Sequence, residues 1–174
     1  MESCINNMKQ EKELIDILLD SQEWNTFECK RASAKPVVLL ETVVAFANTD
    51  GGVLVIGMED PKKTARKDRL IGIHENQDNI SDFLKLIHKE IEPPVLVLEK
   101  SEIDITNTKK EQDTLLVVNV QKSNDVHSLK KGDTFVRNGS QNVKIGSSEI
   151  IRLKYEKGTI RFEDEKSGIQ DLTT

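Results

Sequence analysis

Two predicted β-strands joined by one amphipathic helix constrain the fold of this chain more than any other feature. The first strand, Phe27–Lys30, alternates apolar and charged side chains, which is the period-2 pattern of a half-buried strand. The helix begins near Pro36, whose fixed φ suits a first turn, and it ends before the Gly51-Gly52 turn. The second strand, residues 53–58, is almost continuously apolar, as expected of a central strand that is covered on both faces.

Further elements are predicted on either side of this unit. Apolar residues at helical spacing indicate one helix over residues 5–20 and another over residues 80–91, which begins at Asp78 or Ser81 and stops at Pro93-Pro94. We therefore expect an α/β (α+β) fold in which helices flank a mixed β-sheet. The remaining predictions are strands at residues 69–73, 95–105, 114–121 and 134–137, and a last short helix capped by Ser147 or Ser148.

The size and charge of the chain limit its class. Its 174 residues are expected to form one domain over residues 1–155, followed by a charged, flexible tail over residues 156–174. The net charge of −5 argues against a uniformly basic nucleic-acid coat, although a local patch matters more than the sum. Cys4 and Cys29 match no zinc spacing and fit a reducing compartment. No apolar run near the N-terminus is long enough for a signal peptide or a membrane span, so we expect a cytoplasmic protein with no membrane partner.

Three acidic residues lie at the ends of the two strands. The alternation predicts that Glu28 points away from the core, and Glu23, five residues earlier, joins it only if Glu23 sits in the preceding loop and curls back. Asp60 follows the second strand and approaches Glu28 if the two strands pair. Three acids held together repel one another unless a cation binds, and Mg²⁺ or Mn²⁺ would meet that need. The alternative is that these are solvated acids in a chain with 32% charged residues.

Basic residues flank the same strand ends. Such clusters bind nucleic acid when their phosphate contacts release counterions, and the alternative is a loop that only solubilises the chain. Arg137 precedes an Asn138-Gly139 turn whose backbone amides can hold phosphate, although a purely structural turn is also possible. Trp24, the only tryptophan, either stacks on a base or packs against the core. The candidate phosphate contacts are Lys30, Arg31, Lys35, Lys62, Lys63, Arg66, Lys67 and Arg137, with Arg69 at the end of the same loop.

Taken together, these segments resemble the Schlafen AlbA-like (AlbA_2) domain, a family also described as a DNA-binding domain of bacterial and archaeal regulators. The resemblance covers roughly residues 14–153. It implies an α/β fold and association with DNA or RNA. The strongest matches are Phe27-Glu28-Cys29-Lys30, residues 46–52 (FANTDGG), residues 56–60 (IGMED) and residues 135–140 (FVRNGS).

The resemblance also implies a site and an activity. Ribonuclease members of the family cut structured RNAs such as tRNA with three acids and a divalent cation, and the matching residues here are Glu23, Glu28 and Asp60. These would hold Mg²⁺ or Mn²⁺, and Lys30 would stabilise the developing negative charge. The sequence lacks the Cys/His zinc ligands of eukaryotic members and holds one copy of a domain that they carry in tandem. We therefore expect a homodimeric endoribonuclease, or alternatively a non-catalytic DNA-binding regulator.

Overall fold

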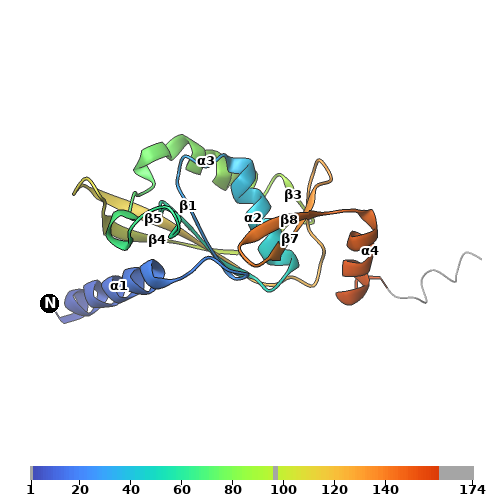
Figure 1. Cartoon of the computed structure of the whole chain (residues 1–174), viewed down its shortest axis with the longest axis horizontal. Coiled ribbons are helices and arrows are strands. Elements are labelled where there is room, and N and C mark those ends of the chain that lie inside the picture. Colours follow the sequence, from blue (N-terminus) through green and yellow to red (C-terminus); the bar gives the residue numbers. More distant parts are fainter. Residues whose placement is uncertain (1, 96–97, 161–174) are drawn as a thin grey trace, which may run out of the picture.

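The computed structural model describes residues 2–95 and 98–160, and it confirms an α+β fold with a mixed sheet (Figure 1). The central sheet has the strand order β1-β2-β5-β4, in which β1 is parallel to β2 and the other neighbours are antiparallel. Two short ribbons, β3 with β6 and β7 with β8, complete the β structure among these residues. The strands are β1 (Phe27–Lys30), β2 (Gly52–Ile56), β3 (Ile91–Glu92), β4 (Leu98–Thr106), β5 (Gln112–Val120), β6 (Ser128–Leu129), β7 (Thr134–Asn138) and β8 (Gln141–Ile145).

Helices cover both faces of the sheet. The helices are α1 (Glu2–Asp20), α2 (Pro36–Asn48), α3 (Gln77–Leu86) and α4 (Ser147–Glu156), with 3-10 turns at Arg66–Asp68 and His74–Asn76. Figure 1 shows α2 and α3 over one face of the sheet and α1 under the other. No helix of the described residues is both long and apolar enough to cross a membrane.

Strand β2 lies between two hydrophobic clusters, as its apolar sequence predicts. Its residues Leu54 and Ile56 belong to the larger cluster, which contains the buried side of α2, including Val43 and Phe46. Val55 belongs to the smaller cluster, to which α1 contributes Leu18 and Leu19. All three β2 side chains are fully buried, and this two-sided burial makes β2 the centre of the fold.

The segment from Phe46 to Gly52 connects α2 to three other parts of the chain. Asn48 donates from Nδ2 to the carbonyl groups of His127 and Phe135, at 2.8 and 2.9 Å, and its Oδ1 accepts from the His127 amide at 2.8 Å. Gly51 adopts a φ of +77°, and a Cβ there would lie 2.7 Å from the Val120 carbonyl oxygen. These contacts explain why this stretch requires an amide side chain at Asn48 and a glycine at Gly51.

Several predicted boundaries differ from the structure. Strand β2 ends at Ile56, because Gly57 has a φ of +100° and turns the chain. A strand over residues 69–73 was predicted, but Leu70 forms only an isolated bridge with Met58. Helix α3 is capped by Asn76, whose Oδ1 accepts from the Asn79 amide, and not by Asp78 or Ser81. Helix α4 begins after Gly146, whose amide donates to Glu149, so neither Ser147 nor Ser148 is its cap.

Two other expectations concern the end of the folded part and the oligomeric state. Lys157 donates to the carbonyl groups of Ala47 and Ser123, so the folded part extends past residue 155; residues 161–174 of the predicted tail lie outside the described residues. The homodimer stays a prediction. Strand β4 is the edge of the sheet opposite β1, and its exposed charged residues Glu99, Lys100, Glu102 and Asp104 are of the kind that discourages edge pairing.

The loop after β2 lies against the β4–β5 hairpin, where the backbone at Gly72 approaches the buried carboxylate of Asp113. Gly72 has a φ of +89°, and a Cβ there would lie 2.0–2.3 Å from the Asp113 carboxylate. Asp113 is 5% exposed and accepts from the amides of His74 and Thr114 and from Asn107 Nδ2. The close approach of this backbone to Asp113 therefore requires glycine.

We predict that Gly72→Ala lowers the free energy of unfolding more than Gly132→Ala does. Gly132 has a similar φ of +96° but nothing within 4 Å of its missing Cβ, so its substitution measures backbone strain alone, about 1–2 kcal/mol. Gly72→Ala adds a steric clash with Asp113, for a further ~1–3 kcal/mol. Urea unfolding followed by circular dichroism measures both variants. Equal losses would show that the loop yields to the added methyl group.

Candidate nucleic-acid interface

The parallel pairing of β1 with β2 brings the carboxyl ends of both strands to one edge of the sheet. Lys30 is opposite Ile56, and the Gly57 amide donates to the Lys30 carbonyl at 2.8 Å. A cavity of about 360 Å³ opens there between the end of β1 and the loop after β2. We call it the Lys30 hollow; its charged lining residues are Lys30, Arg31, Glu59, Asp60 and Lys63. The predicted meeting of the two strand ends is therefore present.

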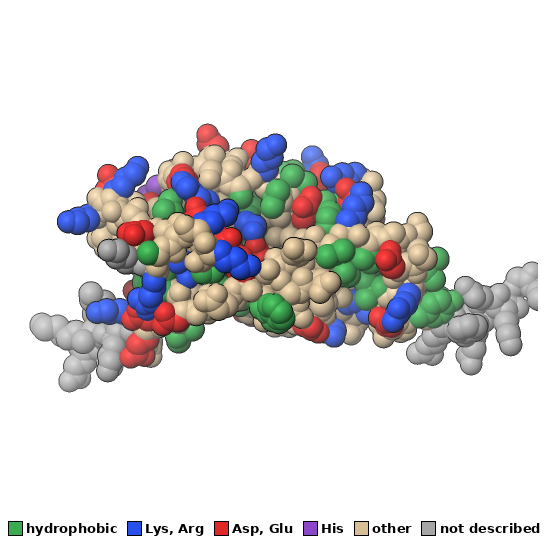
Figure 2. Space-filling model, in the orientation of Figure 1, with side chains coloured by type: hydrophobic (Ala, Val, Ile, Leu, Met, Phe, Trp, Pro, Cys, Tyr) green, Lys and Arg blue, Asp and Glu red, His purple; other side chains and the backbone are tan. Residues whose placement is uncertain are grey.

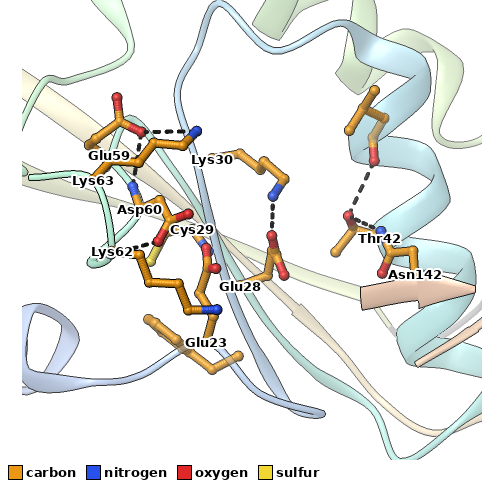
Figure 3. Close-up of polar contacts among 12 residues, drawn as sticks. Glu23, Glu28, Cys29, Lys30, Thr42, Glu59, Asp60, Lys62, Lys63 and Asn142 are labelled. Carbon is orange, nitrogen blue, oxygen red and sulfur yellow. Dashed lines mark hydrogen bonds and ion pairs between the residues drawn. The ribbon is translucent and has the colours of Figure 1, made fainter. Parts of the chain in front are cut away.

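Glu28 forms a buried ion network and is not solvated. Its side chain points to the face of the sheet opposite Cys29 and α1, as the alternation predicts. Strand β7 covers this second face as well, so Glu28 is only 2% exposed. Its two carboxylate oxygens pair with different cations, Oε1 with Lys30 Nζ and Oε2 with Arg137 Nη2. Figure 3 shows Lys30 and Glu28 on one side of β1, with Cys29 and Asp60 on the other. Glu28 therefore pairs with both Lys30 and Arg137 within the protein.

Arg137 has a structural role, which corrects its assignment as a phosphate contact. Its side chain is 1% exposed, and besides Glu28 it donates to the Trp24 carbonyl at 2.9 Å and to Asn142 Oδ1 at 2.7 Å. Its guanidinium also lies 5.1 Å from the centre of the Phe46 ring. With its donors engaged and its side chain buried, Arg137 does not reach the surface. It joins β7 to the start of β1.

Glu23 does sit in the loop before β1 and curls back, as the convergence of the acids requires. It is 9% exposed, and its Oε1 accepts from the Cys29 amide at 3.4 Å. Burial raises the pKa of Glu23, and the nearby carboxylates of Glu28 and Asp60 raise it further, against an opposing effect of Lys30. The three acids therefore lie near enough to interact electrostatically.

This arrangement of side chains does not fit a metal ion as it stands. Across residues 2–95 and 98–160, no group of three or more His, Cys, Asp or Glu side chains is positioned to hold one. The reason is visible in the contacts: Glu28 is occupied by Lys30 and Arg137, and Asp60 Oδ1 accepts from the Lys62 amide at 2.8 Å. Bound Mg²⁺ or Mn²⁺ stays a prediction that would require Lys30 to leave Glu28.

The predicted cations differ in whether an acid already neutralises them. Arg66 pairs with Asp16 and Asp20 of α1, at 2.7 and 2.6 Å, and these contacts raise its pKa. Arg31 pairs with Glu75 and with Glu59. These two arginines therefore fix the loop to its surroundings, and less of their charge is free for a ligand.

The lysines have fewer ion-pair partners than the arginines. Lys63 lies 3.9 Å from Glu59, and it remains 69% exposed. Lys35 and Lys62 are exposed and have no ion-pair partner in the part of the chain that the structure describes. The side chain of Lys67 lies outside the described residues. Lys35 and Lys62 are thus the cations of this region that are open to an external anion.

Sequence reasoning missed the roles of Glu59 and Arg69. Glu59 accepts from Arg31 and from the Asp60 amide, and it lies next to Asp60 in the motif that drew attention to the latter. Arg69 is 1% exposed and donates to the carbonyls of Glu59 and Leu19 and to Cys29 Sγ. No local pattern separates this buried arginine from the exposed cations of the same loop.

We predict that Arg137→Met lowers the free energy of unfolding by about 3–5 kcal/mol, because it leaves Glu28 buried with only one of its two cations. Arg152→Met is the matched control: its pair with Glu156 is exposed, so its loss changes stability by no more than ~0.5 kcal/mol. Adding Glu28→Gln to Arg137→Met should restore part of the lost stability. Denaturant unfolding measures all three, and a small effect of Arg137→Met would mean that Lys30 alone compensates Glu28.

Comparisons with known proteins agree with this architecture. The family model described as Schlafen, AlbA_2 matches residues 23–146, which begin after α1. No curated protein matches the chain. Among solved structures, the DIP2311 protein from Corynebacterium diphtheriae has a TM-score of 0.53 and 15% identity over 87% of this chain. This chain spans only 29% of that protein, and the likeness concerns the fold alone.

A second solved structure is the N-terminal domain of a RecG-related protein from Nitrosomonas europaea, described as a putative ATP-dependent DNA helicase. It has a TM-score of 0.47 and 27% identity, over 64% of this chain and 72% of that one. The family match covers the strand-helix-strand unit, the Lys30 hollow and the β7–β8 turn. This chain belongs to the Schlafen AlbA_2 family.

Proposed function

We propose that this protein binds the phosphate groups of nucleic acid at the Lys30 hollow and at the loop after β2. The observation that supports this most directly is the pair of exposed lysines, Lys35 and Lys62, that no acid neutralises among the described residues. Family membership supports the same conclusion. Phosphate contacts of this kind serve RNA and DNA alike, so the proposal covers either partner.

The start of α2 adds to the positive potential. Lys35 is the N-cap of α2, and the first turn of that helix contains no acidic residue. The helix dipole makes this end electropositive, which disfavours a lysine there unless an anion is nearby. A phosphate group bound beside the hollow, at the start of α2, would interact with both Lys35 and the helix end.

The binding surface is mixed in charge. Figure 2 shows Lys and Arg side chains interleaved with acidic ones over the part of the molecule where the loop between β2 and α3 lies in Figure 1. With a net charge of −5, the protein as a whole does not attract nucleic acid, so binding depends on a local patch such as this one. We therefore expect binding that involves few phosphates, with a modest dependence on salt.

We predict that Lys35→Gln and Lys62→Gln each weaken binding to a fluorescent RNA hairpin and to duplex DNA. Each should also lower the slope of log affinity against log salt by about 1, because each removes one phosphate contact. Arg66→Gln is the control from the same loop, and it should change the slope far less, since Asp16 and Asp20 already neutralise Arg66. Fluorescence anisotropy across several salt concentrations measures the slopes; equal slopes for all variants would place the phosphates elsewhere.

The second candidate function is metal-dependent cleavage of structured RNA such as tRNA. The observation that favours it is Glu23, a buried carboxylate whose pKa is raised by burial and by Glu28 and Asp60. A carboxylate held close to other acids gains most from a divalent cation. Among the described side chains no metal site is preformed, so binding of the cation would have to bring the acids together.

Cleavage is tested by incubating the purified protein with tRNA in Mn²⁺, in Mg²⁺ and in EDTA. We expect cleavage with a divalent cation, and we expect Glu23→Gln to reduce it to background while tRNA binding is retained. Glu23 is a better probe than Glu28, because it lies outside the buried ion pair with Arg137. Wild-type protein that binds but never cleaves would favour the non-catalytic DNA-binding regulator.

A further inference from the structure

We propose that the indole of Trp24 is a platform on which one unpaired base stacks, so that the protein selects single-stranded segments of nucleic acid. The proposal rests on the phosphate binding proposed above and adds the feature that is recognised. Trp24 is 65% exposed, the largest fraction among the large apolar side chains of the described residues. Tryptophan is usually well buried, so an indole left this open needs a reason.

The backbone of Trp24 is held in place. Its amide donates to the Phe27 carbonyl at 3.1 Å, and the Phe27 amide donates back to the Trp24 carbonyl at 3.4 Å, which closes a tight turn. The Trp24 carbonyl also accepts from the buried Arg137 at 2.9 Å. An aromatic group on a fixed backbone loses little conformational entropy when a ligand stacks on it.

The indole is also supported by the turn between β7 and β8. A Cβ built on Gly139 would lie 3.6–4.0 Å from three atoms of the six-membered ring, which places the ring against that turn. Gly139 has a φ of +59°, so the turn presents backbone and no side chain to the ring. One part of the indole therefore packs on the protein, and the rest faces solvent.

Trp24 is linked by a chain of contacts to Lys30, which lines the hollow. Arg137 bonds both the Trp24 carbonyl and Glu28, and Glu28 in turn pairs with Lys30 at the hollow. An aromatic platform beside cations is the arrangement by which proteins bind single strands, with bases on the aromatic group and phosphates on the cations. Bases inside a duplex are stacked on one another and cannot reach the indole. The connection of Trp24 to the hollow that is proposed to hold phosphate thus favours a nucleic-acid strand as the occupant of the ring.

The chain contains one tryptophan, so its tryptophan fluorescence, excited at a wavelength that tyrosine does not absorb, reports on Trp24 alone. We would titrate the wild-type protein with a 12-nucleotide single strand, a duplex of that sequence and an abasic strand with the same number of phosphates. We expect the base-containing single strand to quench the fluorescence and to bind most tightly. The abasic strand should bind more weakly with little quenching.

Variants complete the test by fluorescence anisotropy with a labelled strand. Trp24→Ala should weaken single-strand binding about 5-fold or more, whereas Trp24→Phe should keep most of it, because base stacking needs only an aromatic ring. Ile17→Ala is the matched control: Ile17 is 62% exposed on α1, and its loss should leave binding unchanged. Circular dichroism checks that each variant is folded.

The outcomes separate the two proposals. If single strand, duplex and abasic strand bind wild type equally and without quenching, stacking on Trp24 is wrong while phosphate binding stands. If wild type binds none of them, phosphate binding fails and this inference fails with it. If the fluorescence changes with protein concentration alone, a second copy of the chain covers the indole and the stacking proposal is overturned.

Discussion

The ion pair between Glu28 and Arg137 is the interaction on which the rest of the site depends. Both side chains are almost fully buried, so each compensates a charge that would be costly on its own. The pair joins strand β1 to β7, 109 residues later, and through the Trp24 carbonyl it also fixes the turn before β1. Because Lys30 shares the same carboxylate, a buried network sets the position of a half-buried cation.

The helices and strands near the site could be predicted from the sequence, but the tertiary contacts that bury their side chains could not. The strand Phe27–Lys30 and the helix Pro36–Asn48 have the predicted bounds, because alternation, proline and glycine are local signals. The face that Glu28 occupies was also predicted, but not its burial, since the strand that covers it is far along the chain. Strand β8 was missed for a related reason: its residues are mostly exposed and lack an apolar period.

The cations of the site illustrate the same limit. Sequence placed Arg66 and Lys62 in one basic loop as equals. In the structure, Arg66 is neutralised by two acids of α1 that precede it by 46 and 50 residues, whereas Lys62 is unpaired among the described residues. Charge type is a property of the sequence, but the availability of a charge depends on tertiary contacts. The same holds for Arg137, whose turn motif suggested phosphate and whose side chain is buried.

The contacts of Arg69 have a consequence for the thiol of Cys29. Cys29 lies under α1 at 1% exposure, and burial raises its pKa to about 12, so the group stays a protonated, unreactive thiol. Arg69 holds the last turn of α1 through the Leu19 carbonyl and at the same time contacts the Cys29 sulfur. A thiol reagent therefore reaches the Cys29 sulfur only after a local opening of the packing around it, to which α1 contributes, and the rate of modification at Cys29 reports on that opening.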